Sequence, residues 1–272
     1  MKEFFGFGGY TREAEGFLSW QHLTFVGSLL LAMVVLAVVL GKQNQQKEEK
    51  AKNKVLIWSA LLIDGVEILK IVMLCLRSGS SEAILYNLPL FLCSVQLIAI
   101  PLAAFTSGRI KEAALDFVCI FGILGAVFGT IGAAQNYGVY PVLSLDNVAS
   151  GITHSISGFA SLYIMFSKMA SLKRKNISIT FAILGFFCVA AYVANIILDY
   201  NYMFLVAGDG TPYDILYNLV GGSPVFYPLG VVALFVLYIV VFYSVTLYFK
   251  KKKGVKDVVE KAAEEEKIKV NI

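Results

Sequence analysis

Cys93 and His154 are the residues of this 272-residue chain best suited to nucleophilic chemistry, and both lie within apolar stretches. A thiol attacks a carbonyl carbon well only as the thiolate, so it needs a base beside it, and an imidazole is the usual base. The Glu67 carboxylate could orient that imidazole. A plainer interpretation stays open, in which the cysteine only fills space and the histidine only hydrogen-bonds to a neighbouring helix.

A row of charged residues, Asp64, Glu67 and Lys70, is spaced in steps of three. Residues three apart are neighbours on one face of a helix, so Lys70 can pair with Glu67 while Asp64 lies one turn away. Charged side chains within an apolar stretch are costly and point into the bundle rather than toward lipid. The row therefore predicts either a structural ion pair or a proton relay that also orients a histidine.

Further polar residues fall at the same predicted depth and could line a shared substrate-binding pocket. They are Asp64, Asn87, Gln96, Tyr192 and Asn195. Cys93 and His154 lie at depths that differ by about 5 Å, counted at 1.5 Å per helical residue from the starts of their predicted spans. Side-chain amides donate hydrogen bonds to a developing oxyanion, so Asn87, Gln96 or Asn195 could do so here.

The composition explains why these residues are expected at membrane depth. Apolar residues make up 58% of the chain and charged residues 15%, with a mean hydropathy of +0.72, whereas soluble domains average about 45–50% and about 25%. A membrane span needs about 20 mainly apolar residues. Seven windows qualify: Trp20–Leu40, Val55–Leu76, Ala83–Phe105, Ala113–Ala134, Asn147–Ser167, Ile177–Leu198 and Pro224–Phe249. The sequence predicts an all-α polytopic bundle of seven transmembrane helices and excludes disordered, nucleic-acid-binding and disulfide-scaffold classes.

The positive charges predict the orientation of this bundle. All but four of the 23 lysines and arginines lie in residues 41–54, 106–112, 168–176 or the tail after residue 249. Because positive loops remain in the cytoplasm, we expect a multi-pass cell-membrane protein with its N-terminus outside and its C-terminus cytoplasmic.

The chain is expected to form a single transmembrane domain, residues 1–249, followed by a basic and acidic cytoplasmic tail, residues 250–272. The Lys250–Lys253 run at the start of that tail could hold anionic lipid head groups. It could equally be a solvated flank that stops transfer across the membrane.

Glycines are regularly spaced in the fourth window, Ala113–Ala134. The four-residue step from Gly125 to Gly129 is typical of close helix packing, so we expect these glycines to serve helix contact rather than a ligand. No cofactor or metal is expected, because the cysteines lack metal-ligand spacing and Pro224–Phe249 lacks a lysine for retinal. A haem held by His22 and His154 is the remaining alternative.

The chain resembles the YwaF-like family of bacterial integral membrane proteins at three places: Leu88–Cys93, His154 and Asn201–Leu205. That family is similar to eukaryotic membrane acyltransferases of ether phospholipids, for which a cysteine and a histidine are taken as catalytic. It is more remotely similar to the androgen-induced membrane hydrolases of fatty-acid esters of hydroxy fatty acids. The resemblance implies catalytic roles for Cys93 and His154. Phe91 departs from the pattern, since many members have a histidine there.

Two classes of function follow. The first is a lipid acyltransferase or lipid-ester hydrolase that uses the Cys93–His154 pair on a membrane phospholipid or lysolipid. The second is a proton- or ion-coupled carrier, or a small-molecule-binding membrane protein, that uses the row from Asp64 to Lys70. Loss of function in Cys93→Ala with an intact fold would favour the first class.

Overall fold

The computed structural model describes residues 2–131, 134–170 and 172–270, and the regular structure in these residues is helical. The helices are α1 (Lys2–Phe5), α2 (Trp20–Asn44), α3 (Glu49–Ser78), α4 (Glu82–Leu85), α5 (Gln96–Phe105), α6 (Gly108–Thr130), α7 (Ala134–Val139), α8 (Leu145–Phe166), α9 (Ile177–Leu198), α10 (Tyr213–Leu219) and α11 (Phe226–Val270). Two 3₁₀ turns, η1 (Arg174–Asn176) and η2 (Tyr202–Phe204), flank α9.

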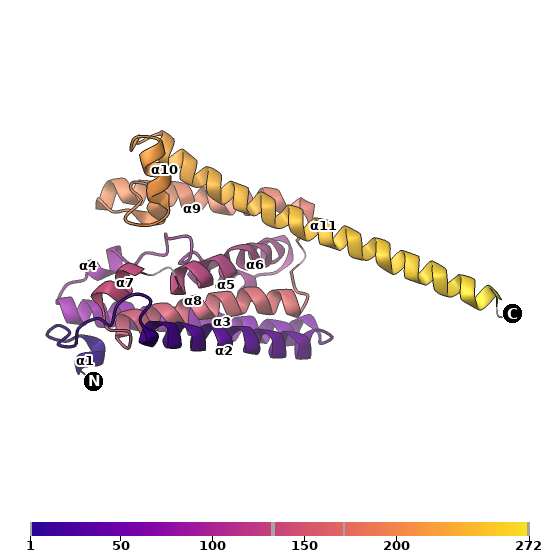
Figure 1. The fold of residues 1–272 in the computed structure, drawn as a ribbon, viewed down its shortest axis with the longest axis horizontal. Coiled ribbons are helices and arrows are strands. Elements are labelled where there is room, and N and C mark those ends of the chain that lie inside the picture. Colours follow the sequence, from indigo (N-terminus) through magenta and orange to yellow (C-terminus); the bar gives the residue numbers. More distant parts are fainter. Residues whose placement is uncertain (1, 132–133, 171, 271–272) are drawn as a thin grey trace.

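The long helices form two layers (Figure 1). One layer contains α2, α3, α5, α6 and α8, and the other contains α9 and α11. Helix α8 is central to the first layer, where it packs against α6, α2 and α3, while α9 contacts α6. The short helices α1, α4, α7 and α10 gather at one end of the bundle (Figure 1).

Local signals set the ends of the helices that matter for the site. The Ser19 hydroxyl oxygen accepts a hydrogen bond from the backbone N–H of His22 at the start of α2, and Ser144 caps α8 in the same way through Asn147. Helix α3 ends at Gly79, which adopts a left-handed backbone conformation with φ of 67°. The caps thus fix the C-terminal end of α3 and the N-terminal end of α8.

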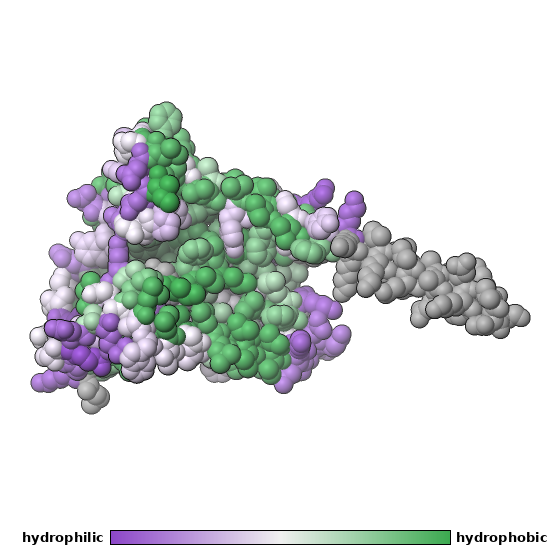
Figure 2. All heavy atoms as spheres, in the orientation of Figure 1, coloured by the Kyte–Doolittle hydropathy of each residue, from purple (hydrophilic) through white to green (hydrophobic). Residues whose placement is uncertain are grey.

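Among the residues that the structure describes, four helices are long and apolar enough to cross a membrane: Trp20–Asn44, Gly108–Val139, Arg174–Leu198 and Phe226–Phe249. Helices α3 and α8 have 30 and 22 residues, which is long enough for a span. They are more polar than the four helices above, because α3 carries the charged row and α8 is rich in serine and threonine. Figure 2 shows hydrophobic residues over the middle of the molecule and hydrophilic ones toward its ends. The molecule is therefore a helical membrane protein.

The third predicted span, Ala83–Phe105, is wrong as a continuous helix. It consists of the one-turn helix α4, a non-helical segment of residues 86–95, and the ten-residue helix α5. Pro89 lacks a backbone N–H, and its ring disfavours the helical conformation for the preceding residue. Irregular backbone at membrane depth is tolerated only where it is covered by protein or lines a cavity, which directs attention to Cys93 in this segment.

Helices α6 and α8 approach each other closely through small residues. The Ser161 hydroxyl donates to the carbonyl of Cys119 at 2.7 Å, and the Ser157 hydroxyl donates to the carbonyl of Gly122 at 3.4 Å. A Cβ atom on Gly122 would lie 2.7 Å from the Ser157 carbonyl oxygen. The small residues therefore bring the two backbones together, as expected for packing in a membrane.

The three basic loops meet at the end of the bundle opposite the short helices. Asn53 donates to the carbonyl of Ala104 and accepts from the Lys111 ammonium at 2.6 Å. The Arg109 guanidinium donates to the carbonyl of Lys175. The two ends of the molecule therefore differ in charge, as the positions of the lysines predicted.

Candidate functional site

Cys93, His154 and Glu67 line one small cavity between α3, α8 and the segment that leads into α5. Its volume is about 60 Å³. The other residues that line it are Ile63, Lys70, Ser94, Leu97, Ser150 and Thr153. The cavity has room for a reacting functional group rather than a whole lipid, so the rest of a large substrate would extend outside it.

The imidazole of His154 is held in a defined orientation. Its Nδ1 lies 2.7 Å from the carbonyl oxygen of Ser150, one turn earlier on α8, and 3.3 Å from the Ser150 hydroxyl. A carbonyl oxygen can only accept, so Nδ1 carries the proton and Nε2 is left with its lone pair. The side chains of His154 and Cys93 line the same cavity and interact electrostatically. The pair therefore has the arrangement of a thiol beside a base.

Two glycines of α6 form the floor under this pair. A Cβ atom on Gly129 would lie 2.0 Å from Cδ2 and 2.1 Å from Nε2 of His154, and one on Gly125 would lie 3.2 Å from the Cβ of Cys93. Because these glycines are four residues apart, they share one face of the helix. The expected small-residue contact is present, and it seats the two reactive side chains directly on α6.

The non-helical segment that carries Cys93 is braced by the loop after α9. The ring of Phe91 packs against Tyr202 and Phe204, with ring centroids 5.2 and 5.7 Å apart. The Tyr202 hydroxyl donates to the carbonyl of Leu85. The two stretches that carried the family resemblance, around Cys93 and around Tyr202, thus contact each other in space.

Asn195 supports this brace and does not line the cavity. Its Nδ2 donates to the carbonyl of Tyr202 at 3.0 Å, and its Oδ1 accepts from the backbone N–H of Tyr202 at 2.6 Å. Both polar ends of the amide bind the Tyr202 backbone, and Asn195 is not among the residues that line the cavity, so it is not placed to donate to an oxyanion there. The expectation that Asn195 lines the pocket does not match this placement, because the loop after α9 folds back onto the helix end.

Four other predicted binding residues also lie outside the cavity lining. Asn87 donates to the carbonyl of Ala83, within its own turn, and Tyr192 is exposed. Gln96 is fully buried at the start of α5, and its side-chain amide has no hydrogen-bond partner among the described residues. Asp64 is half-buried on α3, next to the turn that carries Glu67. Helical spacing alone did not predict the direction in which these side chains point.

Glu67 forms an ion pair with Lys70 at the edge of the cavity. Their Oε1 and Nζ atoms are 2.5 Å apart, and the side chains are 12% and 16% exposed. The predicted pairing is therefore confirmed. The proposed orienting role of Glu67 does not fit the geometry, since its carboxylate faces Lys70 and the imidazole Nδ1 is hydrogen-bonded to Ser150 instead.

The remaining cysteines lie away from this cavity: Cys75, Cys119 and Cys188 are not among its lining residues. Among the described residues, no group of three or more histidine, cysteine or acidic side chains is placed to hold a metal ion. His22 is fully buried against Tyr137, with ring centroids 4.1 Å apart. The ring of Phe17 also lies beside it, with ring centroids 5.2 Å apart.

A second charged network ties the helices together at the end with the short helices. The Arg77 guanidinium binds both carboxylate oxygens of Asp146, at 2.7 and 2.9 Å, and the Tyr10 hydroxyl donates to the same carboxylate at 2.6 Å. Burial raises the pKa of Asp146, but the hydrogen bonds from Arg77 and Tyr10 outweigh burial and hold this pKa below its usual range. Burial, with the contact to Asp146, raises the pKa of Tyr10 to about 12. This network clamps α3 to α8 about 12 Å along α8 from His154.

Fold and site together define a helical membrane protein with a small cavity lined by a thiol and an imidazole. The chain matches the TMEM164 family over residues 17–248, and it belongs to that family. The resemblance to an integral membrane family is thus confirmed at the level of a membrane protein family, and the matching family is TMEM164. No curated protein and no solved structure matches this chain.

Proposed function

We propose that this membrane protein is a lipid acyltransferase or lipid-ester hydrolase in which Cys93 is the nucleophile and His154 the general base. The observation that carries the proposal is that Cys93 and His154 line one cavity while Nδ1 of His154 is held by the carbonyl of Ser150. The bond from Nδ1 to Ser150 leaves Nε2 to take the proton of the thiol. The substrate is a membrane phospholipid or lysolipid, whose ester group reaches the cavity while its chains stay between helices.

The reaction has two balanced halves. In the first, Sγ of Cys93 attacks the ester carbonyl, the S–C bond forms and the ester C–O bond breaks. The thiol proton passes to His154 and then to the leaving alkoxide, which departs as an alcohol. In the second, the hydroxyl oxygen of a lysolipid or of water attacks the thioester carbonyl, the new C–O bond forms and the C–S bond breaks. The hydroxyl proton passes through His154 to the sulfur, which leaves as the thiol, and the product is a phospholipid or a free fatty acid.

Ser94 is the candidate oxyanion donor. It lines the cavity directly after Cys93 in the chain. Thr153 also lines the cavity, but its hydroxyl already donates to the carbonyl of Ser150 at 3.0 Å. A hydroxyl that donates to the carbonyl oxygen as charge develops would stabilise the transition state.

The membrane arrangement belongs to the same proposal. We take the chain as a multi-pass cell-membrane protein with seven membrane-crossing segments, the third of them interrupted, and with the basic end cytoplasmic. His154 is the tenth of the 22 residues of α8, so it then lies close to the middle of the helix, in the half that begins opposite the basic loops. The reaction would take place in the outer half of the bilayer.

Turnover of a labelled lipid tests the chemistry. Purified protein in nanodiscs receives a phospholipid with an isotope-labelled acyl chain and an unlabelled lysophospholipid, and products are followed by mass spectrometry. We expect Cys93→Ala and His154→Ala each to lower the initial rate by about 100-fold or more. Cys75→Ala, which removes a thiol from α3 away from the cavity, is the matched control and should stay within about twofold.

The carrier function makes the opposite prediction in the same set of variants. It requires that Glu67→Gln abolish function, measured as proton or solute flux into vesicles, while Cys93→Ala leaves the flux intact. Wild-type turnover in Cys93→Ala would reject the acyl-transfer proposal.

A further inference from the structure

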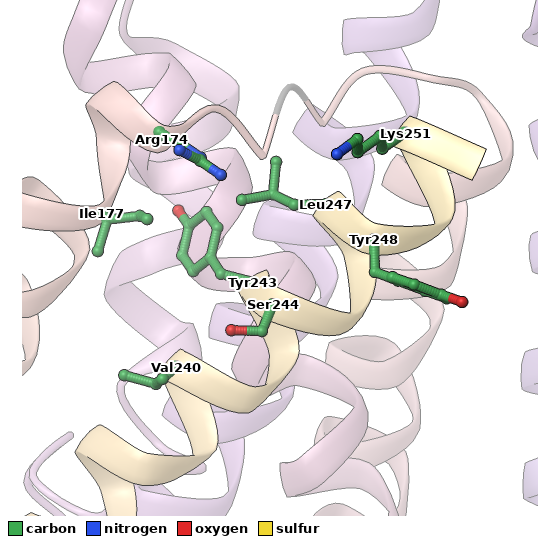
Figure 3. Close-up of a pocket in the computed structure, with 8 residues that line it drawn as sticks. All are labelled: Arg174, Ile177, Val240, Tyr243, Ser244, Leu247, Tyr248 and Lys251. Atoms are coloured by element: carbon green, nitrogen blue, oxygen red, sulfur yellow. The ribbon is translucent and has the colours of Figure 1, made fainter. Parts of the chain in front are cut away.

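An open groove of about 500 Å³ lies between η1, the start of α9 and the middle of α11 (Figure 3). It is separate from the Cys93 cavity and shares no lining residue with it. Ile177, Val240 and Leu247 supply apolar walls, and Arg174 and Lys251 supply two cations. In Figure 3 the guanidinium of Arg174 and the ammonium of Lys251 point toward each other from opposite walls.

The walls of the groove are fixed by one buried acid, Asp116 of α6. Its carboxylate accepts from the backbone N–H of Leu172 at 2.9 Å and from the side-chain amide of Asn176 at 2.8 Å, and these residues flank Arg174. It also accepts from the Tyr243 hydroxyl of α11 at 3.3 Å. The same carboxylate therefore positions both sides of the groove. The shape of the groove is thus held by hydrogen bonds within the fold.

Arg174 differs from Lys173 and Lys175 in its ion pairing. Lys173 and Lys175 both pair with Glu112, at 3.4 and 3.1 Å. Among the described residues, neither Arg174 nor Lys251 forms an ion pair with a carboxylate. Two cations that face each other without an acid between them attract an anion.

The groove also lies at the level where a lipid head group meets the hydrocarbon. Arg174 begins the candidate span Arg174–Leu198, and Lys251 follows the candidate span Phe226–Phe249 by two residues. Both cations thus lie at the same boundary, with apolar side chains extending from them into the span region. Tyr248 is 63% exposed at this boundary, which is where tyrosine is favoured in membrane proteins.

We propose that this groove binds one anionic phospholipid, with its phosphate between Arg174 and Lys251 and an acyl chain along Ile177 and Leu247. The lipid bridges α9 and α11 at the basic end of the bundle. This is more specific than attraction to the Lys250–Lys253 run, of which only the Lys251 side chain is among those the structure describes. The site does not depend on the proposed acyl-transfer reaction.

Native mass spectrometry of the detergent-purified full chain, titrated with dioleoyl phosphatidylglycerol, tests the proposal. We expect one retained lipid, with affinity about fivefold weaker in Arg174→Gln or Lys251→Gln and about 25-fold weaker in the double variant. Lys47→Gln with Lys50→Gln removes the same charge from exposed positions at the same end and should change affinity less than twofold. Ser244→Trp fills the groove without changing its charge, and this variant should retain no lipid.

Three results would overturn the proposal. Equal weakening by the Lys47/Lys50 control would mean diffuse attraction to the basic end. Competition by millimolar inorganic phosphate would mean a phosphate site without a role for the acyl chain. Equal retention of dioleoyl phosphatidylcholine, or full binding in Ser244→Trp, would exclude recognition of an anionic lipid in this groove.

Discussion

The Cys93 cavity and the Arg174–Lys251 groove differ in every physical respect that governs binding. The cavity is about one eighth the volume of the groove, 60 against 500 Å³, and its polar side chains bond to one another. The groove is open, with apolar walls, and its two cations have no acid partner among the described residues.

The comparison shows that the volume of a site does not determine whether its side chains can react. Hydrogen bonds and close backbone contacts fix groups well enough to react, because reactivity depends on positions to within about 1 Å. An open groove with charge at its rim instead selects a ligand by charge and shape. Changes in the cavity should therefore act through geometry, and changes in the groove through charge.

The largest expected effect is that of a single methyl group under the imidazole. Gly129→Ala would place a Cβ atom 2.0 Å from the His154 ring, so the ring must move. We expect acyl transfer to fall by about 100-fold, since a displacement of about 1 Å at a reacting group costs that much. Initial rates of labelled-lipid turnover provide the measurement.

Gly65→Ala is the matched control, because a Cβ atom there meets nothing within 4 Å. Alanine is favoured over glycine within a helix by about 1 kcal/mol, so this variant should be fully active and at least as stable. Wild-type turnover by Gly129→Ala would show that the position of the ring does not matter, contrary to the proposal.

The ion pair at the edge of the cavity should show strong coupling. Lys70→Met alone leaves the Glu67 carboxylate without its partner and should destabilise the protein by about 3 kcal/mol. Glu67→Gln combined with Lys70→Met removes both charges and should recover most of that loss. Thermal unfolding of the four proteins of this cycle measures the coupling, and additive effects would mean that the pair is not buried in the membrane.

A smaller and pH-dependent effect is expected at the Arg77–Asp146 clamp. The pKa of Asp146 is held low in the fold, so its stabilising effect is present above the pKa of an unfolded aspartate, about 3.9. That effect is lost as the pH falls below that value. Asp146→Asn should lower stability by about 2 kcal/mol at pH 7 and flatten the decline between pH 5 and pH 3.

Glu82→Gln, an exposed acid on α4 at the same end, is the control for the clamp and should follow the wild-type pH profile. If Asp146→Asn and the wild type lose stability in parallel over that range, the clamp does not hold α3 to α8.

Cys93 and His154 could be singled out from the sequence by their residue types and by the family resemblance, whereas the depth count for Cys93 assumed a helix over residues 83–105 that the structure does not have. The Glu67–Lys70 pair was predictable because a three-residue step is local. The break over residues 86–95 was only hinted at by Pro89, since one proline predicts a kink and not a ten-residue irregular segment.

The roles of Ser150 and Asn195 could not be predicted from periodicity. Ser150 acts through its carbonyl group, which every residue possesses, so its type carries no signal. Asn195 is drawn away from the cavity by the loop around Tyr202, whose positive φ at Met203 no helical pattern indicates. Gly129 was recognised as a packing residue, but its partner in the site is visible only in the fold.

The central claim is that Cys93 and His154 together form an acyl-thioester, and intact-mass analysis of the protein after incubation with a phospholipid tests it most directly. We predict a mass increase in which an acyl group replaces the thiol hydrogen, located on Cys93 by peptide mapping and removed by neutral hydroxylamine. The adduct should be absent in Cys93→Ala and strongly reduced in His154→Ala. Turnover without any adduct on Cys93, or an adduct that forms equally well in His154→Ala, would contradict the account.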